Sequence, residues 1–258
     1  MRITERKYFN EYTEQIGNQL PDLIRNFNFS ETRRNFDYLT KASAVYSSNI
    51  EGNSIDLNSF MNYELNKDKF KPGKEIEEIE QLIDAYEFAQ SNTLSEKNFL
   101  KAHEILSKTL LIKSKRGKYR TEPVGVFGTS GMAYLAVEPE FVAEQMSLFF
   151  KEIDELLKSE LTETEIFYFA SLIHLRFVHI HPFRDGNGRA ARLLEKWFVT
   201  EKLGKRFWQI PSEEYYKKYQ AEYYDNINLG VNFYELNYDK CLSFLEMLPN
   251  CLKNNISV

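Results

Sequence analysis

Glycine and proline are few in this chain and gather in a small number of places, and this pattern constrains the fold more than any other feature. The 258 residues include 11 glycines and 7 prolines. Because both residue types interrupt helices, the long stretches without them favour helical structure. Hydrophobic residues make up 43% of the chain, which is enough to bury a sizeable core at this length. We therefore expect an all-α fold.

Apolar residues recur every three or four positions in several of these stretches, as they do on the buried face of a helix. Ser30 is a candidate N-cap for one such helix, and Gly52 is its stop. Pro139 stands in the first turn of another helix, where its missing N–H group is tolerated. The predicted helices outside the central motif cover residues 30–50, 74–90, 95–111, 139–157, 212–229 and 236–248.

The segment 121–139 does not follow a helical pattern. Two short extended runs, 124–127 and 132–137, flank a Gly128-Thr-Ser-Gly131 turn. This arrangement predicts a β-hairpin within the otherwise helical chain. A connecting loop that lies on the helices is the alternative, because an isolated hairpin is only marginally stable.

Charge and hydropathy argue against some classes of protein. The formal net charge is −5, so no basic field is available to attract a nucleic-acid backbone. No run approaches the roughly 20 apolar residues that a bilayer-spanning helix needs, and the N-terminus lacks an apolar stretch behind a basic start. We expect no nucleic-acid partner, no membrane and a cytoplasmic location.

The stretch His181-Pro-Phe-Arg-Asp-Gly-Asn-Gly-Arg189 joins two predicted buried helices. Thr162 and Glu165 have the spacing of a capping box at the start of the first helix, and Pro182 disfavours helical geometry at His181. The second helix is predicted over 189–200. The two glycines therefore precede a helix N-terminus, where free backbone N–H groups and the helix dipole bind anions.

The side chains around this turn suit phosphate chemistry. Arg189 and Arg192 share one face of the first helical turn, where two positive charges are unfavourable unless an anion compensates. Asp185 supplies the single carboxylate with which Mg²⁺ is often held beside substrate phosphates. His181 is the residue type that can take a proton from a hydroxyl near neutral pH. The pattern indicates transfer of a phosphate-containing group to a hydroxyl.

Each part of this pattern also has a structural explanation when it is taken alone. A glycine pair between helices is usually a turn, and a single histidine is usually structural. We interpret His103, His174 and His179, which lie within helical patterns, as structural, and Phe183 as a residue that anchors the loop to the core. His181 differs from the other histidines because it lies at a fixed spacing from an acid, an asparagine and two arginines.

The segment from His181 to Arg192 resembles the signature of Fic-domain proteins, H-x-F-x-[DE]-G-N-G-R-x-x-R, with every fixed position filled. Gly117-Lys-Tyr-Arg120 before the hairpin is also similar to the family. The resemblance implies a helical bundle with one β-hairpin flap that binds ATP with Mg²⁺. Such a protein would transfer AMP to a Ser, Thr or Tyr hydroxyl of a target protein and release pyrophosphate.

The resemblance assigns roles to the matching residues. His181 would deprotonate the target hydroxyl, and Asp185 would hold Mg²⁺ between the α- and β-phosphates. Arg189 and Arg192 would bind the outer phosphates. The anion hole would be lined by Gly186, Asn187 and Gly188.

The hairpin would be the family's flap, which aligns a target segment by strand-like backbone pairing. No motif fixes its contacting residues, and we take Val124, Val126 and Phe127 as candidates. Relatives that act as phosphate-transferring toxins carry a lysine where Gly188 stands, so Gly188 favours AMP transfer.

A second match concerns regulation. Ser47-Ser-Asn-Ile-Glu51-Gly52 fits the family's inhibitory pattern, [ST]-x-x-x-E-[GN]. Glu51 falls in the last turn of its predicted helix, where the dipole disfavours a carboxylate unless a cation compensates, and Arg192 is the expected cation. Ser47, one turn earlier on the same face, would help to seat the helix. The alternative is an exposed glutamate beside a glycine cap.

By this resemblance, residues 1–73 form an N-terminal helical region that carries the inhibitory helix. Residues 74–258 form the catalytic core with closing helices. Two other functions stay open: removal of AMP from a modified target, alone or together with its addition, and ATP sensing with little turnover. The target protein could include the chain itself, and a homodimer is compatible with the sequence.

Overall fold

The computed structural model describes residues 1–69, 71–128 and 131–253, and most of them are helical. The prediction of an all-α fold with one hairpin is confirmed. None of the described helices is long and apolar enough to cross a membrane. The helices are α1 (Phe9–Gln15), α2 (Leu20–Asn26), α3 (Arg33–Ile50), α4 (Leu57–Leu65), α5 (Lys74–Gln90), α6 (Glu96–Leu106), α7 (Pro139–Lys158), α8 (Glu163–Ile180), α9 (Asn187–Leu203), α10 (Ser212–Lys218), α11 (Gln220–Ile227), α12 (Leu242–Leu245) and α13 (Met247–Asn250).

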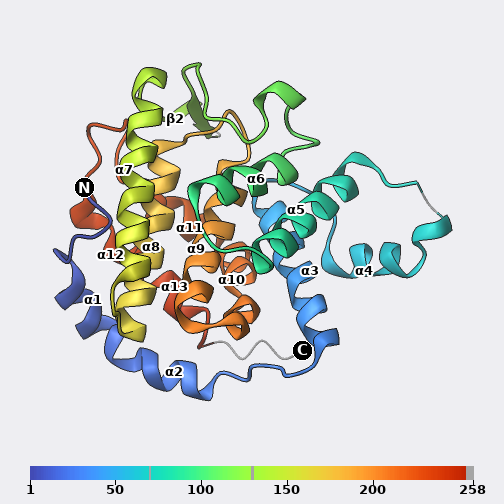
Figure 1. The fold of residues 1–258 in the computed structure, drawn as a ribbon, viewed down its shortest axis with the longest axis horizontal. Helices are drawn as coiled ribbons and strands as arrows, with labels where there is room; N and C mark the ends of the chain where they lie inside the picture. The colour runs from blue at the N-terminus through green and yellow to red at the C-terminus, as the bar shows by residue number, and fades with distance from the viewer. Residues whose placement is uncertain (70, 129–130, 254–258) are drawn as a thin grey trace.

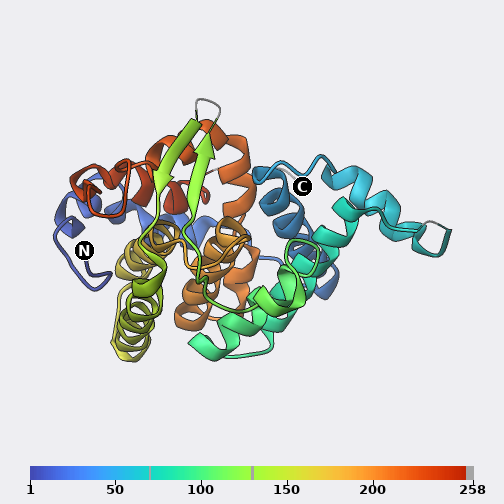
Figure 2. The ribbon, with the colours of Figure 1, turned by 90° about the horizontal axis from the view of Figure 1, so that it is seen from above.

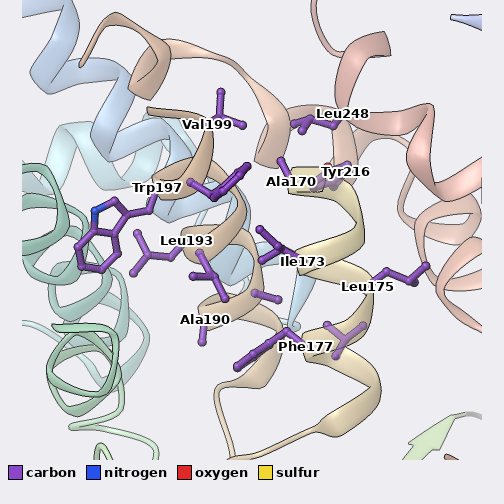
Figure 3. Close-up of a cluster of buried hydrophobic side chains, with 14 of the residues drawn as sticks. Ala170, Ile173, Leu175, Phe177, Ala190, Leu193, Trp197, Val199, Tyr216 and Leu248 are labelled. Carbon is purple, nitrogen blue, oxygen red and sulfur yellow. The ribbon is translucent and has the colours of Figure 1, made fainter. Parts of the chain in front are cut away.

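Helices α8 and α9 form the centre of the fold (Figure 1). Both are buried around much of their circumference because neighbouring helices cover them on several sides, and α9 also buries charged side chains such as Glu195 and Lys196. Side chains of both helices are buried in the core, among them Ile173 and Phe177 of α8 and Leu193 and Trp197 of α9 (Figure 3). This packing fixes the end of α8 relative to the start of α9, which is where the sequence motif lies.

The flanking helices enclose this pair. Helix α7 lies along α8 on one side, while α5, α6 and α3 lie on the other side of α9 (Figure 1). Helix α3 packs against both α5 and α10. Helix α4 and the beginning of α5 extend away from the rest of the molecule. The helix predicted to be inhibitory is therefore an integral part of the bundle.

The strands β1 (Gly125–Gly128) and β2 (Gly131–Leu135) form an antiparallel hairpin at one edge of the helical body (Figure 2). Val126 lies opposite Tyr134, and the register shifts between Val126 and Phe127. The outer edge of β2 is paired in turn: Leu135 donates to the carbonyl of Val231 at 2.9 Å and accepts from the N–H of Phe233 at 3.1 Å. The hairpin prediction is confirmed, and packing of Tyr134 with its 2.7 Å hydrogen bond to the carbonyl of His179 ties the hairpin to α8.

Several predicted helix boundaries are wrong. Helix α3 begins at Arg33 because Thr32, not Ser30, accepts the capping hydrogen bond from Asn35. Helix α6 is capped by Ser95 as predicted but ends at Leu106, where the chain leaves helical geometry at Ser107. In contrast, 74–90 matches α5 exactly, and the capping box of α8 is present.

The C-terminal segment from Ser212 onward contains shorter helices than its apolar pattern predicts. The predicted helix 212–229 is interrupted at Tyr219, whose φ of −110° and ψ of 42° separate α10 from α11. The predicted helix 236–248 is a 3₁₀ turn, which the side chain of Asn237 caps at its start, followed by α12 and α13. Helices α1, α2 and α4 were not predicted.

Candidate active site

The loop between α8 and α9 is held in one conformation by its own residues. His181 ends α8 with a left-handed backbone (φ 51°), and Gly186 precedes α9 with φ 80°. Positive φ is costly for residues other than glycine, so the conformation of His181 must be stabilised by its surroundings. Phe183 is fully buried and its ring stacks on that of His103, with centroids 3.5 Å apart. The interpretation of Phe183 as an anchor agrees with this packing.

Asn187 closes the loop with both ends of its side chain. Its Oδ1 accepts from the N–H of Phe183 at 2.9 Å, and its Nδ2 donates to the carbonyl of Phe183 at 2.8 Å. Each end of the side-chain amide therefore bonds the backbone of Phe183, and the side chain holds the loop together. What Asn187 can offer an anion is its backbone N–H at the first position of α9.

His181 has the protonation state of a general base. Its Nδ1 donates to the carbonyl of Val178 at 3.2 Å, so the lone pair is on Nε2. Burial of the imidazole lowers its pKa to about 4, with a further contribution from the charge of Arg120. The ring is therefore neutral at pH 7 and able to accept a proton.

Arg192 is fully buried and surrounded by acceptors. Its Nε donates to the hydroxyl of Ser47 at 2.9 Å, and its terminal nitrogens donate to the carbonyl of Ser47, to the hydroxyl of Tyr223 and to the carboxylate of Glu51. The ion pair with Glu51 has an N–O distance of 2.7 Å. Glu51, the partner that the sequence proposed for Arg192, is thus in contact with it, and so is Ser47, which was expected to help seat the helix.

The carboxylate of Glu51 also covers the glycine turn. A methyl group built on Gly188 would overlap this carboxylate, which therefore lies directly against the start of α9. Burial alone would raise the pKa of Glu51, but the charges of Arg192 and Arg189 outweigh it, and the pKa is lowered. The position that suits an anion is filled by an ionised side chain of the protein itself. Gly52 follows Glu51 with φ 96°, a conformation that favours glycine.

Arg189 has a different partner that the sequence did not reveal. Its Nε and Nη2 donate to one oxygen of Glu78 on α5, at 3.1 and 2.7 Å, and both side chains are nearly buried. Glu78 is one of four acidic residues near the start of α5, and helical periodicity alone does not indicate which of them meets α9.

Asp185 is exposed and free to contact a ligand. One of its oxygens accepts the N–H of Gly186 at 2.6 Å. The described residues contain no group of three or more acidic, histidine or cysteine side chains that would hold a metal ion by themselves. A single carboxylate beside a glycine turn at a helix N-terminus nevertheless fits Mg²⁺ that arrives with phosphates.

Arg120 links the loop between α8 and α9 to the base of the hairpin. Its buried guanidinium donates to the carbonyls of His181 at 2.7 Å, Val137 at 2.5 Å and Glu122 at 3.1 Å. The segment Gly117–Arg120 was noted for its similarity to the family, but this similarity gave Arg120 no role. Its backbone N–H donates to the carbonyl of Pro182 at 2.8 Å, so one residue fixes both segments.

The three candidate docking residues, Val124, Val126 and Phe127, lie at the start of the hairpin, close in sequence to the residues that Arg120 contacts. Val124 precedes β1, and Val126 is half-buried within it. Phe127 belongs to β1, and its side chain lies outside the described part of the structure. Among the described residues β1 pairs only with β2, so its other backbone edge faces outward from the two-stranded sheet.

The fold and the site define a helical protein with a neutral histidine beside a glycine turn at the junction of two buried helices. Residues 93–199 match the sequence model of the Fic/DOC family. The chain therefore carries a Fic domain.

Named relatives support the same family. The chain is 31% identical over 160 residues to protein adenylyltransferase Fic of Nematostella vectensis and 33% identical over 154 residues to protein adenylyltransferase fic-1 of Caenorhabditis elegans. These alignments cover 58% and 56% of this chain but 35% and 28% of the relatives. The chain thus spans about a third of the length of the curated relatives that it matches.

Solved structures share the fold. A Fic family protein from Desulfovibrio desulfuricans G20 superposes with a TM-score of 0.80 at 21% identity, over 95% of this chain and 74% of that chain. A Fic domain containing signaling protein from Bacteroides thetaiotaomicron VPI-5482 gives a TM-score of 0.67 at 22% identity, over 93% and 92% of the two chains. At these identities the likeness concerns the fold alone.

Proposed function

We propose that this chain is a protein adenylyltransferase that moves AMP from ATP to a hydroxyl of a target protein and that Glu51 restrains it. The observation that carries the proposal is the arrangement at the start of α9. A neutral histidine, a glycine turn and two arginines meet there, and a glutamate from α3 occupies the anion position. The names of the curated relatives agree with this activity.

The proposed chemistry uses these residues directly. The hydroxyl oxygen of the target attacks the α-phosphorus of ATP, and its proton moves to Nε2 of His181. The bond from the α-phosphorus to its bridging oxygen breaks, and pyrophosphate leaves. N–H groups at the start of α9 stabilise the phosphate oxygens. Asp185 is the residue that would hold Mg²⁺, which neutralises phosphate charge when bound.

The target would pair with the free edge of β1. The edge of β2 is already bonded to the segment 231–233, so β1 is the strand available for augmentation. Arg120 connects the base of the hairpin to His181 and would keep the aligned hydroxyl in register with the base.

Inhibition follows from the same geometry. While Glu51 holds Arg192, that arginine has no free edge for an outer phosphate, and the carboxylate repels an anion from the turn. ATP would then bind in a pose unsuited to attack at the α-phosphorus. Release of Glu51 would free both the turn and Arg192.

The test compares wild type, Glu51→Gly and the Glu51→Gly/His181→Ala double variant after incubation with Mg²⁺-ATP, with intact mass as the readout. We expect AMP-sized adducts on Glu51→Gly alone, because that variant has the base without the restraint. Equal adducts on wild type would contradict inhibition by Glu51. Adducts on the double variant would contradict the role of His181.

Removal of AMP is the second candidate, and one observation favours it. Glu51 is close enough to His181 for its charge to act on the pKa of the imidazole, so its carboxylate could orient a water near the base. Absence of adducts on all three proteins, together with release of AMP from a modified target, would support this reaction. Absence of both activities with retained ATP binding would indicate a nucleotide sensor.

A further inference from the structure

Both arginines of the phosphate site already have carboxylate partners, and the partners come from different helices. Glu51 at the end of α3 pairs with Arg192, and Glu78 in α5 pairs with Arg189. The two pairs differ in how the acid approaches, and this difference suggests that the two acids have different roles.

The carboxylate of Glu78 reaches Arg189 from α5 and does not lie at the glycine turn, where Glu51 occupies the position that suits an anion. The atoms nearest to a methyl group built on Gly188 belong to Glu51 and Arg192, and none belongs to Glu78. Glu78 lies in the second turn of α5, whose neighbouring residues Ile79 and Leu82 are fully buried. An acid fixed in this way does not have to leave for an anion to enter.

The hydrogen bonds to Glu78 use only one side of the Arg189 guanidinium. Nε and Nη2 are directed to Glu78, whereas Nη1 has no hydrogen-bond partner among the described residues. A guanidinium held along one edge is fixed in orientation, because its donors form a rigid planar fork. A phosphate at the start of α9 could then be met by the remaining Nη1 donor.

We propose that Glu78 is a positioning residue that holds Arg189 by one edge so that its free Nη1 faces the outer phosphates of the nucleotide. The inference rests on the proposed function, since it assumes that a nucleoside triphosphate binds at the start of α9. It makes Glu78 a permanent support of the site and leaves Glu51 as the displaceable restraint.

The experiment measures binding rather than turnover. In the Glu51→Gly/His181→Ala background, calorimetry gives the affinity for Mg²⁺-ATP before and after addition of Glu78→Ala, Glu78→Gln or Arg189→Ala. AMP, which lacks the outer phosphates, is the matched ligand control. Glu87→Ala, at an exposed acid on the same helix, is the matched protein control.

We expect Glu78→Ala to weaken ATP binding about tenfold, the size of one charge-assisted contact, while AMP binding stays unchanged. Glu78→Gln should restore ATP binding, because its amide oxygen still accepts from Nε and Nη2. Glu78→Ala added to Arg189→Ala should cause no further loss, since the acid acts through the arginine.

Other results would overturn the proposal. Tighter ATP binding by Glu78→Ala would make Glu78 a competitor of the nucleotide, and unchanged binding by a folded variant would make it structural. If Glu78→Ala does not fold, Glu78→Asp keeps the charge but shortens the reach, and unchanged ATP binding by that variant would also overturn it. A background protein that binds no ATP would instead refute the proposed function, and the inference with it.

Discussion

His181 combines a strained backbone with an imidazole that stays neutral, and both properties come from its place at the end of α8. The left-handed conformation turns the chain out of the helix, and the carbonyl of Val178 fixes the tautomer. Arg120 accounts for part of the stabilisation, because it binds the carbonyl of His181. A neutral imidazole held in this way is what the proposed role of His181 as a base requires.

The lowered pKa of His181 makes a prediction about the pH dependence of transfer. A base works in its neutral form, and with a pKa of about 4 this form predominates down to pH 5. The Glu51→Gly variant should therefore change its transfer rate less than about twofold between pH 7.5 and 5.5, whereas a histidine with pKa 6.5 would lose about tenfold. Initial rates at saturating Mg²⁺-ATP, with circular dichroism to verify folding, check this. A tenfold loss at pH 5.5 would show that burial does not control this histidine.

At the scale of elements, the C-terminus of α3 is held by three side chains from α10 and α11. Lys217 donates to the carbonyl of Asn49 at 3.0 Å, while Gln220 and Tyr224 donate to the carbonyl of Ile50 at 2.7 and 2.9 Å. Carbonyls in the last turn of a helix have no partner within the helix, so such donors stabilise its end. The position of Glu51, the next residue, depends on this contact.

Loss of this contact should weaken the inhibition. We predict that the Gln220→Ala/Tyr224→Phe variant self-modifies faster than wild type and slower than Glu51→Gly, because Glu51 remains but is less firmly placed. Hydrogen exchange of residues 43–53 should increase in parallel, and this readout does not require activity. Glu222→Gln, at an exposed position on α11, is the control. Unchanged exchange and unchanged modification would show that α3 is held by its other contacts alone.

The sequence predicted those elements whose signals are local. Pro139, the capping box of α8 and the apolar periodicity of α5 lie within the segments that they define, and these helices begin where expected. The division at Tyr219 was missed because the apolar pattern continues through a residue that has left helical geometry.

The same distinction applies to the site. The residues from His181 to Arg192 and the Glu51 motif were readable as short patterns. Glu78 and the contacts of Arg120 join segments far apart in the chain, so their partners are determined by the packing of α5 and of the hairpin base against the centre. The hydrogen bonds between the Asn187 side chain and Phe183 were not predicted, because the motif names the residue but not the partner of its side chain.

At the scale of the whole molecule, three neutral histidines tie the core together. His103 accepts the N–H of Gly117 at Nδ1 and bonds the carbonyl of Asp185 through Nε2, while His179 contacts Tyr238 and the carbonyl of Ile227. Together with His181, His103 and His179 join α6, α8, the loop between α8 and α9, and the C-terminal segment that contains Ile227 and Tyr238. Each of these bonding patterns suits an uncharged ring.

These histidines should make folding stability depend on pH. Burial lowers the pKa to about 4 for His103 and His181 and to about 3 for His179, below the 6.5 expected in the unfolded chain. As the pH falls below 6.5, the unfolded state therefore binds protons that the folded state does not. The free energy of unfolding should decrease by up to about 1.4 kcal/mol per histidine for each pH unit. Glu214 and Glu246, whose pKa burial raises, act in the opposite sense.

Urea unfolding at pH 7.5, 6.5 and 5.5 tests this expectation, with the largest decrease between the last two values. His103→Gln is the informative variant, because glutamine can keep one hydrogen bond but cannot take up a proton. The free energy of unfolding of this variant should decrease less with falling pH than that of wild type, by about the contribution of one histidine. Equal stability at all three pH values would mean that protonation of the carboxyl groups with raised pKa cancels the effect. If the free energy of unfolding of His103→Gln changed with pH as steeply as that of wild type, the pH dependence would come from His179 and His181. It would then arise at α8 and not at the contact of α6 with the loop between α8 and α9.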